Sequence, residues 1–177
     1  MVDYSSRHSI LKNDVVYRHK TGRLLAHRIG QSFKELGYHA WINVGQTNGV
    51  DLKVWDNELN LVVAAEILNW APTTNLDKNR KARIVRNLLS QNCNRLLIYT
   101  EMGNEFTLKD LSPQGISTLK IGYQILARYF YSKLDANQAV GRKIDSRETK
   151  LLIKSKLKDY LLFLNAQSLA ANAPNIA

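Results

Sequence analysis

The sequence predicts a single α/β domain with a central mixed sheet, flanked by helices and extended by further helices at its C-terminal end. Three observations predict this class. Short apolar runs typical of strands fill much of the first half of the chain. Apolar stripes at helical spacing stand before, between and after those runs. A length of 177 residues with 45% hydrophobic residues suits one core with a helical appendage.

A polar N-terminal arm, residues 1–20, is predicted to precede a first helix at about residues 22–36. The apolar residues of this helix recur at helical spacing, and Gly37 ends the run. The stripe consists of Leu25, Ile29, Phe33 and Leu36. We therefore expect one face of this helix to pack on the sheet.

Three strands are predicted to follow the first helix. Residues 38–44 form the first strand, and the turn signal at 46–49 separates it from a second strand at 50–55. A tight turn at 56–58 leads into a third strand at 59–68. The third strand is almost continuously apolar, which predicts burial on both faces.

A second helix is predicted at about residues 77–91, after a loop that contains Pro72. A fourth strand follows at 95–100, so the element order over residues 21–110 is α-β-β-β-α-β. The buried stripe of the second helix is predicted to be Ile84, Val85, Leu88 and Leu89.

The remainder, residues 111–165, is predicted to be a helical extension that packs on the core or at a dimer interface. Ser112 followed by a proline is typical of a helix start. The apolar stripe expected after it is Ile116, Leu119, Tyr123, Leu126 and Phe130.

The C-terminal end is divided into a linker at 136–145, a last helix at 146–165 and a flexible tail of small residues at 166–177. Apolar residues on the C-terminal helices beyond those needed for the core make a homodimer plausible.

The charge balance favours a polyanionic partner. There are 25 Lys and Arg against 15 Asp and Glu, a net charge of +10, which exceeds the roughly 2–8 usual for a small domain. Nucleic acid, most simply DNA, is the first candidate partner, and an acidic membrane surface is the second. The chain has no apolar run that approaches the roughly 18 residues of a membrane span and no signal core, so we expect a soluble, intracellular (cytoplasmic) protein. Cys93 is the only cysteine, which excludes a disulfide framework and a cysteine-rich zinc site.

Two acidic residues on neighbouring predicted strands carry the chemistry. Asp51 opens the second strand, and Glu66 stands in the apolar third strand, where a carboxylate is costly unless it is paired or bound to a metal. A hairpin through the 56–58 turn could place both side chains on one face. Hydrolysis of a phosphodiester uses a divalent metal, and Mg²⁺ or Mn²⁺ prefers oxygen ligands of this kind.

Plainer interpretations exist for each of these residues. Asp51 could be a turn residue, and Glu66 could face solvent at an edge or pair across the strands with Lys53. The chain could also be an assembly module that uses its C-terminal helices.

Residues 22–100 resemble the core of the PD-(D/E)XK nuclease superfamily, especially its archaeal Holliday junction resolvase-like and RecB-like branches. The segments that carry the resemblance are FKELGY at 33–38, GVDLKV at 49–54 and LVVAAEI at 61–67. The resemblance implies a restriction-endonuclease-like fold and cleavage of DNA with Mg²⁺ or Mn²⁺. It also implies that Asp51, Glu66 and the Ile67 carbonyl hold the metal.

The sequence departs from the family pattern at two places. The family's lysine two residues after the acid is Leu68 here, and the glutamate of the first helix aligns with His27. Lys53 is the first candidate to replace the lysine, because it points to the same face of its strand as Asp51. Lys78 or Lys81 is the second candidate. The third possibility is that no lysine is used and the domain is inactive or only binds DNA.

Basic residues crowd the start of the second predicted helix and suggest contacts with phosphates, although a solvated helix face is the plainer interpretation. The residues predicted to bind nucleic acid are Lys78, Arg80, Lys81 and Arg83. Trp70, in the loop after Glu66, is a further candidate because it could stack on a base, although tryptophans usually serve core packing.

Overall fold

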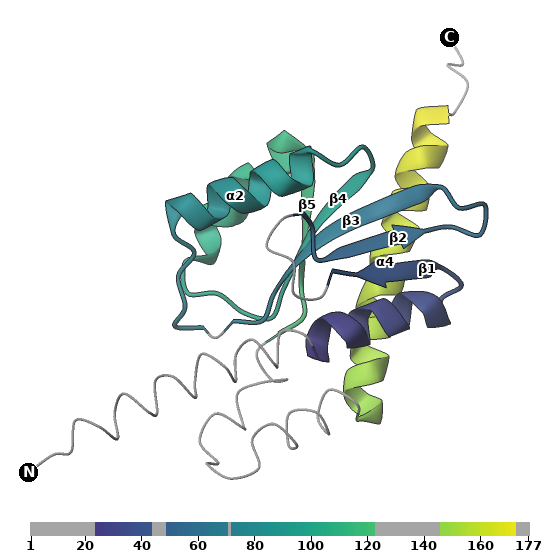
Figure 1. The fold of residues 1–177 in the computed structure, drawn as a ribbon, viewed down its shortest axis with the longest axis horizontal. Helices are drawn as coiled ribbons and strands as arrows, with labels where there is room; N and C mark the ends of the chain where they lie inside the picture. Colours follow the sequence, from purple (N-terminus) through teal and green to yellow (C-terminus); the bar gives the residue numbers. More distant parts are fainter. Residues whose placement is uncertain (1–23, 44–48, 71, 123–145, 173–177) are drawn as a thin grey trace, which may run out of the picture.

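The chain forms a five-stranded mixed sheet with helices on both faces, in a computed structural model that describes residues 24–43, 49–70, 72–122 and 146–172 (Figure 1). The strand order is β1-β2-β3-β4-β5. The predicted α/β class with a central mixed sheet flanked by helices is confirmed. The predicted arm at 1–20, the linker at 136–145 and the end of the tail lie outside the described residues, as do Tyr123, Leu126 and Phe130.

The first three strands form an antiparallel meander. They are β1 (His39–Ile42), β2 (Leu52–Trp55) and β3 (Leu61–Leu68). The register between β2 and β3 shifts by one residue between Val54 and Trp55, where the ladder is irregular. This irregularity lies beside the tight turn that joins the two strands.

The last two strands run parallel to β3. They are β4 (Asn94–Tyr99) and β5 (Ile116–Lys120). A parallel pair needs a crossover connection, and the helix α2 (Lys78–Leu89) supplies it between β3 and β4. The side chain of Asp77 caps α2 by accepting a hydrogen bond from the backbone N–H of Arg80 at 2.8 Å.

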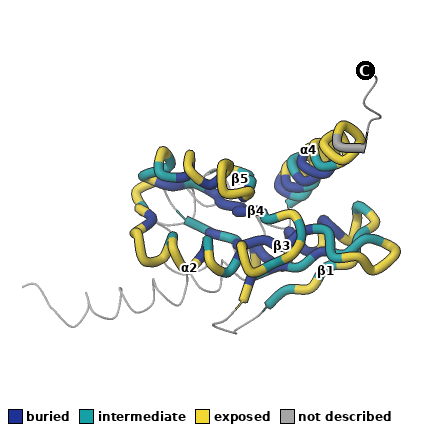
Figure 2. The backbone as a smooth tube through the Cα atoms, turned by 90° about the horizontal axis from the view of Figure 1, so that it is seen from above, coloured by how far each residue is buried: buried dark blue, intermediate teal, exposed yellow. Residues whose placement is uncertain are grey.

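The helices form two layers. The first helix, described over residues 24–35, packs with α4 (Arg147–Asn172) on one face of the sheet. On the other face lie α2 and two short 3-10 helices, η1 (Glu105–Asp110) and η2 (Ser112–Gln114). Figure 2 shows the buried residues gathered along the strands between these layers.

Each face of the sheet has its own apolar core. Leu52, Val54 and Ala65 face the first helix and α4. Ala64 and Leu68 face α2 on the opposite side. The near-continuous apolar run of β3 thus supplies both cores, as the sequence predicted.

The predicted helix that begins near Ser112 is wrong over residues 116–120, which form the edge strand β5. The Ser112-Pro113 start opens only the short η2. Gly115 then takes a left-handed conformation with φ 78° and turns the chain into the sheet. Ile116 faces the α2 side, whereas Leu119 packs toward the first helix, so their spacing of three reflects the two faces of a strand.

The last helix is longer than predicted. It continues through residues 166–172, which we expected to be part of a flexible tail. Alanine is the best helix former, so a segment rich in alanine extends the helix readily. None of the helices in the described part of the chain has a stretch long and apolar enough to cross a membrane.

Candidate active site

The structure brings Asp51 and Glu66 together, as the sequence predicted. The ladder between β2 and β3 pairs Leu52 with Ala65, so the next position places Asp51 opposite Glu66. Side chains at directly opposed positions share a face. Both carboxyl groups therefore lie on the face covered by α2, where that of Asp51 raises the pKa of Glu66 through its charge and a hydrogen bond.

The backbone of β3 fixes the position of Asp51. The N–H of Ile67 donates to Oδ2 of Asp51 at 2.8 Å. The regular ladder of β2 ends at Leu52, so this carboxylate stands where a backbone acceptor would otherwise continue the sheet. Asp51 is therefore held by the strand that carries Glu66.

Glu66 is buried, with 7% of its surface exposed. Desolvation by burial is the main reason that its pKa rises to about 8, and the charge of Asp51 and the hydrogen bond shared with Asp51 raise it further. Asn87 and the positive charge of Arg80 oppose this rise. A proton or a cation is therefore needed to hold these two carboxyl groups side by side.

Asn87 closes the site from α2. Its Nδ2 donates to Oε1 of Glu66 at 3.3 Å and lies 3.5 Å from the backbone oxygen of Gly49. Asn87 was not among the residues predicted from the sequence. The signal was a polar side chain between Ile84 and Leu88 on the buried stripe of the helix, where an apolar residue is usual.

Asn43 is a second neighbour of the site that was not predicted from the sequence. It follows β1, and its backbone N–H donates to the backbone oxygen of Asp51 at 2.9 Å. The register of β1 and β2 places it opposite Asp51. Its position could have been found only by pairing the two strands correctly.

Arg80 is the cation that acts on Glu66. Its guanidinium lies 4.9 Å from the centre of the Trp70 ring, in a cation–π contact, and its charge opposes the rise in the pKa of Glu66. The structure thus brings two predicted residues, Arg80 and Trp70, into contact with each other, and the charge of Arg80 acts on Glu66.

Lys53 lies on the predicted face, two residues along the strand from Asp51. It pairs with Ala64, not with Glu66, across the β2–β3 ladder. Burial raises the pKa of the Cys93 thiol, and the charges of Arg95 and Lys53 oppose that rise. The charge of Lys53 is therefore felt at Cys93, just before β4 begins.

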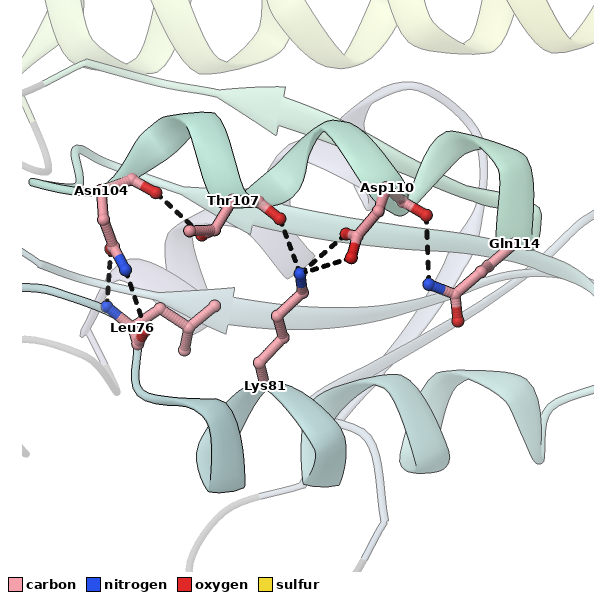
Figure 3. A network of polar contacts seen from close by, with 6 residues as sticks. All are labelled: Leu76, Lys81, Asn104, Thr107, Asp110 and Gln114. Carbon is pink, nitrogen blue, oxygen red and sulfur yellow. Dashed lines mark hydrogen bonds and ion pairs between the residues drawn. The ribbon is translucent and has the colours of Figure 1, made fainter.

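Lys81 is separated from the site. Its ammonium group donates to the backbone oxygen of Thr107 at 2.6 Å and pairs with Asp110 at 2.7 Å (Figure 3). Figure 3 shows this side chain reaching from α2 to η1, next to the contact between Asn104 and Leu76. Lys81 thus joins two elements of one layer.

The other predicted residues are spread over the surface or the core. Lys78 and Arg83 are exposed on α2. His27 is exposed on the first helix, which packs on the opposite face of the sheet from the side chain of Glu66. Leu68, two residues after Glu66, is buried under α2.

The donor set suits a hard divalent cation. No cluster of three or more His, Cys, Asp and Glu occurs in the portion of the chain that the structure describes. Mg²⁺ is commonly held by only one or two carboxylates, with the remaining positions left to water and phosphate. The adjacent oxygens of Asp51 and Glu66 meet that requirement, and a cation would relieve their mutual repulsion.

Comparisons of the chain with family models, with curated proteins and with solved structures find no match. The proposed function therefore rests on the site itself. Its features are two adjacent carboxyl groups, an amide that donates to one of them, and a guanidinium stacked nearby.

Proposed function

We propose that the chain is a metal-dependent deoxyribonuclease of the PD-(D/E)XK type, with Mg²⁺ or Mn²⁺ as its cofactor. The observation that carries the proposal is the adjacency of Asp51 and the buried Glu66 on neighbouring strands. A basic chain with a net charge of +10 suits a DNA substrate.

The order of elements supports the proposal of a restriction-endonuclease-like fold. A helix precedes the antiparallel β1, β2 and β3, and α2 crosses over to β4, which is parallel to β3. This is the α-β-β-β-α-β order that the resemblance of residues 22–100 implies. Asp51 stands directly before its second strand, and Glu66 lies on its third.

In this proposal Asp51, Glu66 and the Ile67 carbonyl hold the cation. The cation would supply Lewis-acid activation of the phosphodiester and of the attacking water. The Ile67 N–H and Asn87 keep the two carboxylates oriented. Arg80 stabilises negative charge on the phosphate and takes the role expected of the absent lysine.

A titration of Mg²⁺ and Mn²⁺ into the full-length protein with single-stranded and duplex DNA tests the proposal. We expect metal-dependent cleavage that Asp51→Asn or Glu66→Gln lowers at least about a hundredfold, while DNA binding in EDTA is retained. Glu58→Gln is the matched control, because Glu58 is exposed on the β2–β3 turn. Absence of cleavage by the wild type at every metal concentration would refute the nuclease.

A DNA-binding protein without catalysis is the second candidate. The burial of Leu68 favours it, because no lysine can occupy that place without disturbing the core. This candidate predicts salt-dependent DNA binding with no cleavage, and binding that is indifferent to Mg²⁺.

A homodimer forms part of the proposal. Large apolar side chains on α4 are exposed on the side away from its buried stripe of Ile153 and Leu157. The exposed residues are Leu151, Leu152, Leu162, Phe163 and Leu169. Two copies of α4 could cover these side chains in a self-complementary interface.

A further inference from the structure

The half of the sheet formed by β1 and β2 carries aromatic and basic side chains on the α2 side. His39 lies opposite Trp55, and Trp41 lies opposite Lys53. Their strand neighbours pack into the core of the other face, so these four side chains share the α2 side. The neighbours are Ala40, Ile42, Leu52 and Val54.

The rings on this face are accessible. Trp41 is 46% exposed, and His39 is exposed beside it, whereas Lys53 and Trp55 are half-buried. A large ring on a sheet face is normally covered, since its burial stabilises the fold. Helix α2 packs on β3 and β4, which leaves the face of β1 and β2 beside it.

The aromatic face continues into the candidate active site. Trp55 and Lys53 of β2 and Asp51, directly before β2, lie at every second position and so share one face of the sheet. Residues two apart on a strand are separated by roughly 6.7 Å. Asp51 is thus about two such steps from Trp55, and Glu66 lies directly across from it.

The side of α2 that faces β2 is basic. Asn87 on this helix contacts Glu66 and Gly49, which fixes which side of α2 is turned toward the two strands. Arg80 and Arg83 stand seven and four positions earlier, on the same stripe of the helix. A polyanion that approached Asp51 would therefore lie between the aromatic side chains of β1 and β2 and the basic side chains of α2.

We infer that the β1–β2 face binds an unpaired stretch of nucleic acid, with bases stacked on Trp41 and the backbone along Arg80 and Arg83, and delivers it to Asp51 and Glu66. The inference rests on the proposed function and names its substrate class. Unpaired bases have free faces for stacking on aromatic rings, whereas the bases of a duplex already stack on each other. Lys53 serves here as a backbone contact beside Trp41.

Equilibrium binding to the full-length protein in EDTA tests the inference. The probes are a thymidine oligonucleotide, a uridine oligonucleotide of equal length, and a blunt duplex. We expect Trp41→Ala to weaken single-strand binding about tenfold and to leave duplex binding unchanged, because the stacking of one base is lost. Trp41→Phe keeps an aromatic face and should retain most of the affinity.

Phe106→Ala is the matched control. Phe106 is 73% exposed on η1, away from β1 and β2, and its removal should not change single-strand binding. Unchanged single-strand affinity of Trp41→Ala, or an equal loss for the duplex, would overturn the inference. So would a loss that Phe106→Ala reproduces.

The binding experiment and the cleavage experiment can refute their two proposals independently. Binding is measured without metal, so it decides the stacking face even if the wild type cuts nothing. Conversely, if the wild type cleaves DNA with metal and Trp41→Ala binds single strands as well as the wild type, the proposed nuclease stands and the β1–β2 binding face is overturned. If a uridine strand is bound and cut as well as a thymidine strand, the substrate is single-stranded RNA as well as DNA, and the inference about the β1–β2 face still stands.

Discussion

Glu66 ties the chemistry of the site to the stability of the fold. Its carboxyl group titrates near 4.5 when solvated but near 8 in the folded chain, chiefly because of burial and then because of Asp51. Between these pH values the folded chain holds a proton that the unfolded chain has lost. The free energy of unfolding should therefore fall as the pH rises through this window, by up to about 1.4 kcal/mol per pH unit, and level off above it.

Urea unfolding of the metal-free protein from pH 5 to pH 9 measures this dependence. Glu66→Gln should remove most of the slope, because the amide has nothing to ionise. At the upper end of the range, Mg²⁺ or Mn²⁺ should restore stability to the wild type by mass action. A flat profile for the wild type in EDTA would show that Glu66 is not held as a proton-binding group.

In the proposed nuclease, Arg80 and Lys53 are alternative candidates for the group that stabilises charge on the phosphate, and their positions predict different outcomes. The charge of Arg80 acts on Glu66, whereas that of Lys53 acts on Cys93. We expect Arg80→Ala to lower kcat for DNA cleavage about a hundredfold, in the range seen for the loss of one charge-stabilising group. Lys53→Ala should mainly raise KM. The reverse pattern in steady-state kinetics would assign the catalytic role to Lys53.

At the scale of elements, α2 divides its basic residues between two tasks. Lys81 bonds to Thr107 and Asp110 on η1, whereas Arg83 is exposed on the side toward the site. Lys81→Met should lower the free energy of unfolding by about 1 kcal/mol and leave the salt dependence of DNA binding unchanged. Arg83→Met should leave the free energy of unfolding unchanged and reduce the slope of log K for DNA binding against log salt by about 0.9.

Denaturant titration and binding at several salt concentrations measure both effects. A variant of Lys81 that binds DNA with a shallower salt slope would show that its ion pair opens in the complex. Lys81→Met and Arg83→Met make a matched comparison, because each removes one positive charge from the same helix.

Elements with strong local periodicity were predicted correctly, and those decided by a distant partner were not. The stripe of the first helix and the apolar run of β3 can be read locally. Strand β5 was missed because its Ile116 and Leu119 fit helical spacing, and only pairing with β4 makes the segment a strand.

The same distinction applies to the candidate site. Glu66 was conspicuous because a carboxylate interrupts an apolar strand, and Asp51 followed from the hairpin. Asn87 and the ion pair of Lys81 depend on how α2 lies on the sheet and on a partner 29 positions away. The polar Asn87 on an apolar stripe was a local signal, but its partner Glu66 and the distant partner of Lys81 cannot be predicted from the local sequence.

At the scale of the whole molecule, the exposed apolar side of α4 predicts a dimer in solution. The double variant Leu151→Glu and Leu162→Glu should convert it to a monomer, because each change would place a charge in the shared interface. Sedimentation equilibrium measures the mass. Leu59→Glu is the matched control, since Leu59 is as exposed but lies on the β2–β3 turn. A wild type that sediments as a monomer at every concentration would contradict the dimer.

The irregularity in the β2–β3 hairpin decides whether the two acids meet at all. Near the turn Trp55 pairs with Leu61, but from Val54 onward the partner is one residue later. If the pairing at the turn continued unchanged, Asp51 would oppose Ala65, and Glu66 would point into the core under α4. A single extra residue in β3 thus sets which residues of the hairpin share a face. Removing it would separate Asp51 from Glu66, although neither residue is changed.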